Sequence, residues 1–217
     1  MGRSSWRRWP RTWRSVLTAD ESEVHVWIAE LSEPRPAAEA VLDREELERA
    51  GRFRFEADRR RYCAAHAALR EILAGYLGCQ ARAIRIERDP GGKPRTAGVE
   101  FSLSHSGELA LVAVARGTAV GVDIERIRGL PDAAAIAGRF FPPEEAAEVR
   151  ASPESFFRLW TRREAWLKAE GIGLAGIGRE QPAGWTVLDL SPAPGYAAAV
   201  AFQGRRRAVL RRFTAAG

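Results

Sequence analysis

Two acidic residues in the segment Gly121-Val122-Asp123-Ile124-Glu125 are the first candidates for chemistry. Apolar and polar residues alternate here, which predicts a strand with Asp123 and Glu125 on one face, about 6.6 Å apart along the backbone. Neighbouring carboxylates repel each other unless a cation lies between them, and hard oxygen ligands in an open, hydrated site suit Mg²⁺. Alone the motif is weak, because two acids on an exposed strand face would look the same.

A second candidate lies between Phe156 and Lys168, where apolar residues recur at helical spacing. Glu164 and Lys168 are four residues apart on one face, and a surface ion pair is the simplest interpretation. The lysine usage favours a more specific role, because only Lys93 and Lys168 among the 34 basic residues are lysines. A lysine offers the compact point charge that suits a phosphate.

Two further motifs are ambiguous. Gly91-Gly92-Lys93-Pro94 lacks the spacing of a P-loop, but a lysine on a glycine turn can still reach a phosphate. Ser104 and His105 are neighbours on a predicted strand and therefore point to opposite faces, which disfavours a hydrolase dyad. The three histidines are scattered, so a zinc site is not expected.

The elements that must position these residues can be predicted from periodicity and turn residues. We expect a long helix from Asp58 to Gly78, one or two short helices over 132–150 around Pro142-Pro143, and a second long helix over 154–170 that stops at Gly171. Glycine and proline turns separate the predicted strands, which span 23–29, 84–86, 101–105, 109–115, 120–125, 185–190, 197–202 and 207–213.

Each half of the chain thus contains strands and one long helix. A length of 217 residues fits one large domain or two small ones. We predict an α+β fold of two similar lobes, each a small sheet packed on a long helix, over residues 20–117 and 118–217, after a basic and disordered extension at 1–19. Ligands favour the cleft between such lobes.

Composition excludes several classes of protein. With 46% hydrophobic and 29% charged residues the chain is not generally disordered. Residues 1–19 hold five arginines and no acid, so removing them lowers the net charge from +6 to +1, which argues against nucleic-acid binding. No apolar run reaches the roughly 18 residues of a membrane span, and no secretory signal is recognisable. Two cysteines, too far apart to pair along one helix, indicate a reducing, cytoplasmic location.

Four motifs, read together, resemble the 4′-phosphopantetheinyl transferase superfamily in order and spacing. They are Gly92-Lys93-Pro94, Phe-Ser-Leu-Ser-His-Ser at 101–106, Gly-Val-Asp-Ile-Glu at 121–125, and Trp-Thr-Arg-Arg-Glu-Ala at 160–165 with Lys168 downstream. The resemblance runs from about residue 23 to about residue 213 and includes Asp58-Arg59-Arg60-Arg61 and Arg139-Phe140-Phe141 with Glu145 following. The length is similar to the long, two-lobed branch, which implies a pseudo-twofold monomer rather than a trimer.

The resemblance implies an activity and a set of site residues. The family transfers the phosphopantetheine arm of coenzyme A to a serine of an apo acyl or peptidyl carrier protein and releases adenosine 3′,5′-bisphosphate. Asp123, Glu125 and Glu164 would hold Mg²⁺ against the pyrophosphate, and Glu164, directly or through a metal-held water, would help to remove the serine proton. Lys168 would steady the pyrophosphate. Coenzyme contacts are implied for Lys93, Ser104, His105 (near the 3′-phosphate), Arg61 and Arg49.

Some residues depart from the family pattern, and two other functions compete with this one. Arg163 stands where a lysine is usual, Ser102 where asparagine is common, and Glu46 where some members carry another base. A different Mg²⁺-dependent enzyme, such as a nuclease or nucleotidyl transferase, could use the same acids without coenzyme A. A non-enzymatic module that binds nucleic acid would instead show steep salt dependence. The carrier protein, and thus fatty-acid, polyketide or nonribosomal peptide synthesis, stays open.

Overall fold

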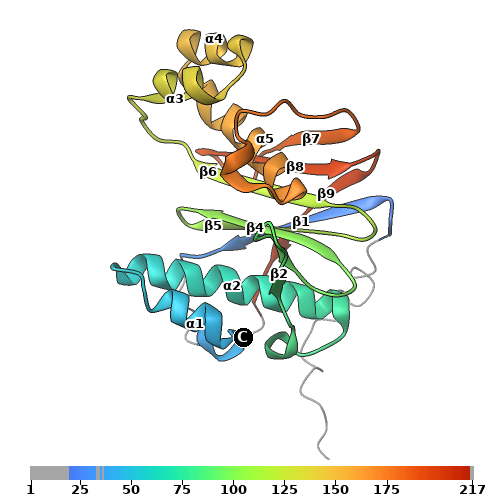
Figure 1. The fold of residues 1–217 in the computed structure, drawn as a ribbon. Coiled ribbons are helices and arrows are strands. Elements are labelled where there is room, and N and C mark those ends of the chain that lie inside the picture. Colours follow the sequence, from blue (N-terminus) through green and yellow to red (C-terminus); the bar gives the residue numbers. More distant parts are fainter. Residues whose placement is uncertain (1–19, 33–34, 36, 216–217) are drawn as a thin grey trace, which may run out of the picture.

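The computed structural model describes residues 20–32, 35 and 37–215 (Figure 1). The basic extension predicted at 1–19 lies outside these ranges. The first half holds β1 (Glu23–Glu30), α1 (Arg44–Ala50), α2 (Glu56–Leu77), β2 (Glu87–Arg88), β3 (Pro94–Arg95), β4 (Glu100–Ser106) and β5 (Leu109–Ala115), with 3-10 turns η3 (Ala38–Val41) and η4 (Ala81–Ala83). The second half holds β6 (Val120–Arg126), α3 (Ala133–Phe140), α4 (Pro143–Ala151), α5 (Ser155–Glu170), η5 (Gly173–Gly176), β7 (Trp185–Leu190), β8 (Tyr196–Gln203) and β9 (Arg207–Phe213).

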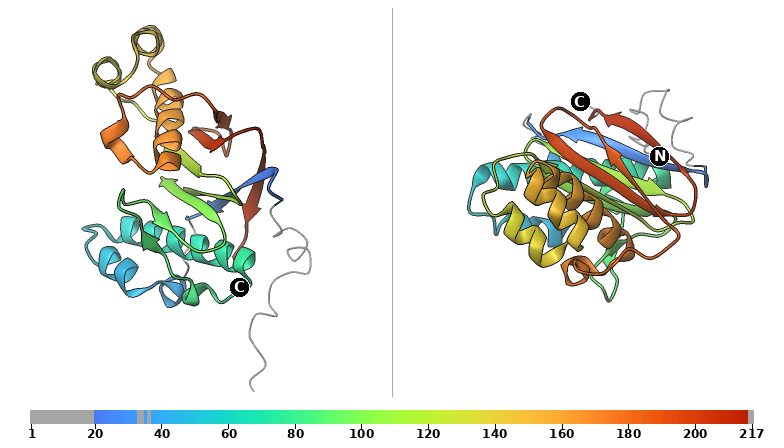
Figure 2. Two further views of the ribbon diagram at one scale, coloured as in Figure 1. Left: turned by 45° about the vertical axis from the view of Figure 1, so that its right-hand side comes forward. Right: turned by 90° about the horizontal axis from the view of Figure 1, so that it is seen from above.

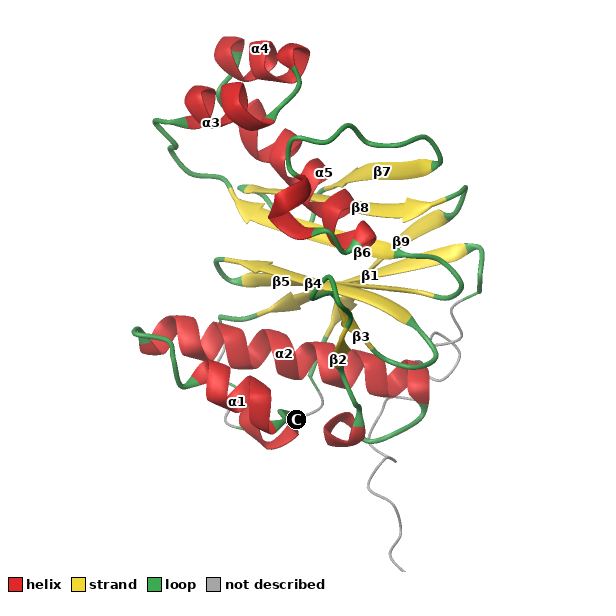
Figure 3. Ribbon diagram, in the orientation of Figure 1, coloured by secondary structure: helices red, strands yellow, loops and turns green. Residues whose placement is uncertain are grey.

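The α+β class predicted from the sequence is confirmed, and the molecule has four layers. One sheet has the strand order β4-β5-β1-β9 and the other β6-β8-β7. Helix α2 covers the outer face of the first sheet and α5 covers the outer face of the second (Figure 3). The β2–β3 hairpin forms a separate two-stranded sheet.

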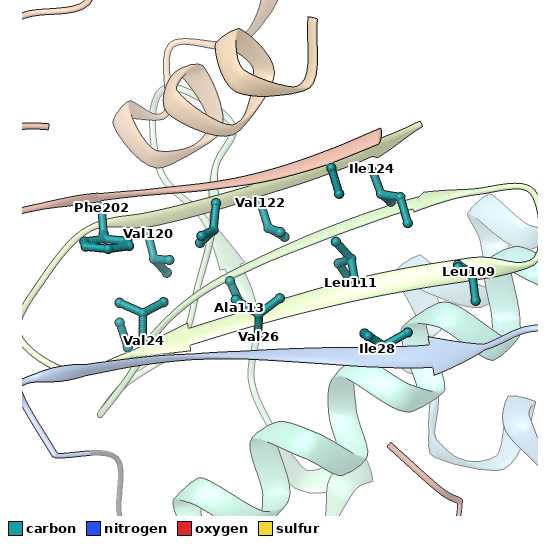
Figure 4. Close-up of a cluster of buried hydrophobic side chains, with 13 residues drawn as sticks. Val24, Val26, Ile28, Leu109, Leu111, Ala113, Val120, Val122, Ile124 and Phe202 are labelled. Atoms are coloured by element: carbon teal, nitrogen blue, oxygen red, sulfur yellow. The ribbon is translucent and has the colours of Figure 1, made fainter. Parts of the chain in front are cut away.

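The inner faces of the two sheets share one hydrophobic core. Val24, Val26 and Ile28 of β1 point toward Val122 and Ile124 of β6 (Figure 4). These side chains are at most 4% exposed, so the sheets are held together mainly by burial of apolar surface. Alternation along each strand sends the intervening residues outward, to the side that its helix covers.

The last strand is not where we expected it. We predicted that residues 118–217 form the second lobe, but β9 leaves that lobe and pairs with β1 in parallel, from Glu23↔Arg207 to Ala29↔Phe213. Figure 2 shows β9 beside β1 in both views. Alternation reveals that residues 207–213 form a strand, but it does not reveal the partner, because strand pairing is a long-range choice.

Two boundaries also differ from the sequence prediction. The prediction of a strand at 84–86 is wrong. Arg70 Nη1 donates a hydrogen bond to the Ile84 carbonyl oxygen (3.0 Å), and strand β2 begins only at Glu87. Helix α2 starts at Glu56 after an extended Phe55, so Asp58 lies in the first turn, where it pairs with Arg61. The predicted helix stops are confirmed: Gly78 and Gly171 both adopt the left-handed conformation (φ 66° and 80°) that favours glycine.

Neither cysteine forms a disulfide: Cys63 is a buried free thiol and Cys79 an exposed one. No helix within the described ranges is both long and apolar enough to span a bilayer.

Candidate active site

Strand β6 and helix α5 approach each other unusually closely, and Gly121 makes this approach possible. A Cβ atom at this position would lie 2.0 Å from the Ala165 carbonyl oxygen and 2.4 Å from the Ala169 amide nitrogen. Those distances are far below van der Waals contact, so only glycine fits. The next outward-facing residues of β6 are Asp123 and Glu125, which the close approach brings to Glu164 and Lys168 of α5.

These four charged side chains share one small cavity. Its volume is about 350 Å³, and its floor and walls come from β4, β6 and α5. The lining residues are Leu103, Ser104, His105, Asp123, Glu125, Trp160, Glu164 and Lys168. The structure thus brings together all three predicted metal ligands, together with the lysine predicted to steady a pyrophosphate.

One oxygen of Asp123 is fully occupied. Lys168 Nζ donates to Asp123 Oδ1 (2.6 Å), and Ser104 Oγ donates to the same atom (2.7 Å). Lys168 Nζ also donates to Ser104 Oγ (3.0 Å). Lys168 therefore bridges to β6 and β4 rather than forming the intrahelical pair with Glu164 that its spacing suggests.

Two other carboxylate oxygens are buried without a hydrogen-bond partner among the described residues, Asp123 Oδ2 and Glu164 Oε1. The side chain of Asp123 is only 4% exposed, so its free oxygen is withdrawn from water. Uncompensated buried oxygens of this kind are costly unless a cation or proton satisfies them.

The pKa values of Glu164 and Glu125 are raised mainly by burial and further by the neighbouring carboxylates. Burial raises the pKa of Glu164 to about 7, the Lys168 ammonium opposes this rise, and the carboxylates of Asp123 and Glu125 add to it. Burial also raises the pKa of Glu125, and Asp123 contributes in the same direction. Without a cation, the cluster compensates by holding a proton near neutral pH.

The donor set fits a hard divalent cation such as Mg²⁺. Within the described ranges, no group of three or more His, Cys, Asp or Glu side chains is arranged so that it could hold a metal ion. Mg²⁺ does not need a closed protein cage, because it commonly binds through one or two carboxylates and completes its shell with water and substrate phosphates. The free oxygens of Asp123 and Glu164 supply the protein part of such a shell.

A larger cleft adjoins this cavity. It has a volume of about 600 Å³ and shares Leu103, His105 and Lys168 with the small cavity. Apolar side chains such as Leu69, Ile86 and Phe101 form part of its wall, with the β2–β3 turn and α1 at its rim. It could take an elongated ligand whose charged middle lies beside Lys168.

Arg49 supplies a positive charge to the larger cleft, and His105 supplies an imidazole. Both side chains are exposed, and Arg49 lies 5.8 Å from the centre of the Tyr62 ring. Desolvation by the cleft walls lowers the pKa of His105, with nearby cations including Lys168 and Arg49 acting in the same direction. A bound anion would reverse that shift.

Lys93, a predicted coenzyme contact, forms hydrogen bonds within the protein instead. The Lys93 ammonium is buried and donates to the carbonyl oxygens of Val120 (3.2 Å) and Ala169 (2.7 Å). Burial lowers its pKa to about 8. Lys93 lines the large cleft, but its charged end ties the β2–β3 hairpin to β6 and α5, so a coenzyme contact of this group stays a prediction.

Arg61 lines neither cavity. Its guanidinium is held by Asp58 (3.1 Å) and Glu108 (2.9 Å), at the start of α2. The geometry gives no support to the coenzyme contact that the resemblance implied for Arg61, because both acids already neutralise its charge.

Sequence reasoning missed Ser106 and Trp160. Ser106 Oγ donates to Glu125 Oε2 (2.8 Å), and Trp160 lines the small cavity. A signal for Ser106 was present, since Ser102, Ser104 and Ser106 alternate on one strand face. Trp160 offered no such signal, because an aromatic residue at helical spacing is more often part of the core.

Comparison with known proteins gives matches over both halves. Residues 26–117 match the N-terminal family of 4′-phosphopantetheinyl transferases, and residues 119–215 match the 4′-phosphopantetheinyl transferase superfamily. The 4′-phosphopantetheinyl transferase HetI of Nostoc sp. is 37% identical over 215 residues, which covers 87% of this chain and 91% of the relative.

Two further relatives are similar over shorter ranges. A phosphopantetheinyl transferase of Thraustochytrium sp. is 32% identical over 186 residues, or 73% of this chain and 65% of the relative. The 4′-phosphopantetheinyl transferase psf-1 of Bacillus pumilus is 35% identical over 134 residues, or 58% of this chain and 56% of the relative.

Proposed function

Because this chain belongs to the 4′-phosphopantetheinyl transferase superfamily, we propose that it modifies apo carrier proteins with the phosphopantetheine arm of coenzyme A. The hydroxyl oxygen of a carrier serine attacks the phosphorus that bears the pantetheine arm. A new phosphate ester forms, the P–O bond to the nucleotide half breaks, and adenosine 3′,5′-bisphosphate leaves. The serine proton passes to a base.

One observation supports this proposal most strongly: buried oxygens of Asp123 and Glu164 that have no partner within the described ranges lie in the same cavity as the Lys168 ammonium. Phosphoryl transfer demands little covalent chemistry from a protein and depends on positioning and on neutralising charge. Such a cavity can bind a metal–pyrophosphate complex, because its carboxylate oxygens can bind the cation and its ammonium can bind the pyrophosphate.

We assign Asp123, Glu125 and Glu164 as the residues that would hold Mg²⁺. When bound, the ion would supply Lewis-acid stabilisation of the pyrophosphate oxygens. The chain itself would contribute Lys168, whose ammonium is already oriented by Asp123 and Ser104 and needs no reorganisation to meet an anion.

We assign Glu164, directly or through a metal-held water, as the group that accepts the serine proton. The Oε1 atom of Glu164 is buried in the small cavity and has no hydrogen-bond partner among the described residues, so it is available to a proton. Asp123 is less suited to that role, since its Oδ1 atom is already taken by two donors.

The larger cleft would take the nucleotide half of coenzyme A. Its position next to the small cavity, with Lys168 and His105 common to both, suits a donor whose pyrophosphate lies at the junction. Arg49 and His105 would contact the 3′-phosphate, while Tyr62, Leu69 and Ile86 would offer apolar surface to the adenine ring. Lys93 would support the cleft through its carbonyl bonds.

We further propose that the enzyme acts as a monomer in a reducing, cytoplasmic setting. Every assigned residue comes from one chain, so no second copy is needed to complete the site. The two thiols form no disulfide, which agrees with a reducing location. Light scattering of the eluted protein tests the oligomeric state.

The decisive experiment incubates the full chain with coenzyme A, Mg²⁺ and a panel of apo acyl and peptidyl carrier proteins, followed by intact mass. We expect one carrier to gain the mass of one phosphopantetheine, with no gain after chelation or when the carrier serine is replaced by alanine. If no carrier is modified and the chain instead cleaves or extends nucleic acid without coenzyme A, the transferase proposal is wrong.

A further inference from the structure

Strand β4 presents a row of serines toward β6. Ser102, Ser104 and Ser106 occupy alternate positions, so their side chains share one face, and each hydroxyl bonds to an atom of β6. β4 and β6 are edge strands of different sheets, and the serines satisfy polar groups of β6 that none of the described strands pairs with.

Ser106 makes two of these bonds. Its Oγ accepts from the Arg126 amide (3.1 Å) and donates to Glu125 Oε2 (2.8 Å). Because the backbone amide already occupies the acceptor side of the hydroxyl, the hydroxyl hydrogen is directed to the carboxylate. Glu125 is thereby fixed by a partner from the other sheet.

Glu125 and Asp123 are held in the same manner. Each has one oxygen bonded to a serine of β4, namely Oε2 to Ser106 and Oδ1 to Ser104. The second oxygen of Asp123, Oδ2, is buried without a hydrogen-bond partner among the residues that the structure describes. The Ser106 bond uses Oε2 of Glu125 and leaves Oε1 to other ligands. Outer partners of this kind orient ligating carboxylates in metal sites.

We infer that Ser106 is a positioning residue that orients Glu125 for a divalent cation. This inference rests on the proposed function, which places the ion between the carboxylates. Ser106 touches neither the ion nor the substrate in this arrangement. It acts through Glu125, so its removal should weaken the cation without changing the coenzyme cleft.

Ser102 provides a matched control within the same row. Its Oγ accepts from the Val122 amide (3.1 Å), so it also joins β4 to β6, but it bonds to no carboxylate among the described residues. Ser102→Ala and Ser106→Ala should therefore both lower the melting temperature. Only Ser106→Ala should alter cation binding.

The test uses Mn²⁺ as a probe of the oxygen-ligand site, measured by electron paramagnetic resonance on the full chain with coenzyme A present. We expect Ser106→Ala to weaken Mn²⁺ about 10- to 100-fold and to raise the Mg²⁺ concentration for half-maximal transfer similarly, with the KM for coenzyme A unchanged. Ser106→Thr, which keeps the hydroxyl, should retain wild-type Mn²⁺ affinity. If Ser106→Ala does not fold, Ser106→Cys, nearly isosteric but a poor donor, replaces it.

The outcomes separate this inference from the proposed function. Wild-type Mn²⁺ affinity in Ser106→Ala, with an active wild-type enzyme, would overturn the role of Ser106 and leave the transferase intact. An equal loss of affinity in Ser102→Ala would also overturn it, because the effect would then come from the contact between the strands. A wild-type chain that neither binds Mn²⁺ nor modifies any carrier would refute both.

Discussion

The two lobes share one topology but use the space beneath the helix differently. In the first, β4-β5-β1 form three adjacent strands under α2, and in the second β7-β8-β6 repeat that order under α5. In both, the first strand of the lobe pairs antiparallel with the last. Strand β9 is an addition to the first sheet that has no counterpart in the second.

The difference lies in the residues that each lobe's first strand turns toward its helix. β1 presents His25 and Trp27, both at most 2% exposed, and Trp27 Nε1 and His25 Nδ1 bond to the Tyr76 hydroxyl of α2. β6 presents Gly121, which lets α5 approach, and then two carboxylates that border a cavity. The contact between β1 and α2 is therefore filled with side chains, whereas the contact between β6 and α5 borders a cavity.

This comparison suggests that activity depends on few positions of a repeated frame. The two strands carry the same residue types toward the shared core. These are Val24, Val26 and Ile28 on β1 and Val120, Val122 and Ile124 on β6. What distinguishes the lobes is an absent side chain and a pair of acids on the other face of one strand.

The largest effect is expected from neutralising one acid of the open contact. Asp123→Asn keeps the shape of the side chain but removes the charge that would bind the cation. Transfer should fall by more than the roughly 10- to 100-fold loss typical of an outer-shell partner, while the circular dichroism spectrum stays that of the wild type. Glu30→Gln, on the exposed end of β1, is the control and should retain full activity. Turnover within a few fold of wild type in Asp123→Asn would contradict the metal assignment.

A second test closes the approach of β6 to α5. Gly121→Ala places a methyl group against the Ala165 carbonyl, so the strand and helix must separate, at a cost of about 1–3 kcal/mol in the free energy of unfolding. Activity should fall as well, since the carboxylates of β6 and α5 move apart. Denaturant titration and initial rates measure the two effects.

The control for this glycine is Gly138→Ala. Gly138 lies in helix α3, and a Cβ atom there meets nothing within 4 Å. Alanine should stabilise that helix by about 0.5–1 kcal/mol and leave activity unchanged. A Gly121→Ala protein as stable and active as Gly138→Ala would show that the close approach does not matter.

The sequence predicted more of the local structure than of the long-range contacts. The bounds of β7 and β9 matched because alternation is a local signal. The pairing of β9 with β1 was missed because it joins residues 184 positions apart, as in Glu23↔Arg207. The acids and Lys168 could be selected by motif and charge type. The carbonyls that hold Lys93 and the Glu108 carboxylate that holds Arg61 could not, since both partners are far away in the sequence.

Lys93 has two candidate roles that a substitution can distinguish: a structural hydrogen-bond donor and a direct contact of coenzyme A. Its ammonium caps the Ala169 carbonyl near the C-terminus of α5 and also holds the Val120 carbonyl of β6. Lys93→Met should therefore cost about 1–3 kcal/mol of stability, because two carbonyls lose their donor, and should lower kcat more than it raises the KM for coenzyme A. A raised KM with unchanged stability would instead support the direct coenzyme contact.

The smallest effect concerns the filled contact of the first lobe. Burial lowers the pKa of His25, with Arg211 and Arg207 acting in the same direction, while Glu23, bonded to Nε2 at 3.0 Å, opposes the shift. The unfolded chain therefore takes up a proton near pH 6.5 that the folded chain resists. Stability should fall as the pH is lowered from 7.5 to 5.5, by no more than about 1.4 kcal/mol per pH unit from this group.

Replacing the histidine separates this effect from other titrations. His25→Gln keeps hydrogen-bonding capacity toward the Tyr76 hydroxyl but cannot take up a proton, so the slope of stability between pH 7.5 and 5.5 should become shallower. Glu23, whose pKa is lowered to about 2 by its bonds to His25 and Arg207, contributes only below about pH 4.5, outside this window. Transfer activity should not change, because His25 lines neither cavity. If urea titrations give the same slope of the free energy of unfolding against pH in His25→Gln and the wild type, the contact between β1 and α2 does not respond to protonation of His25. Charge would then matter only where β6 meets α5.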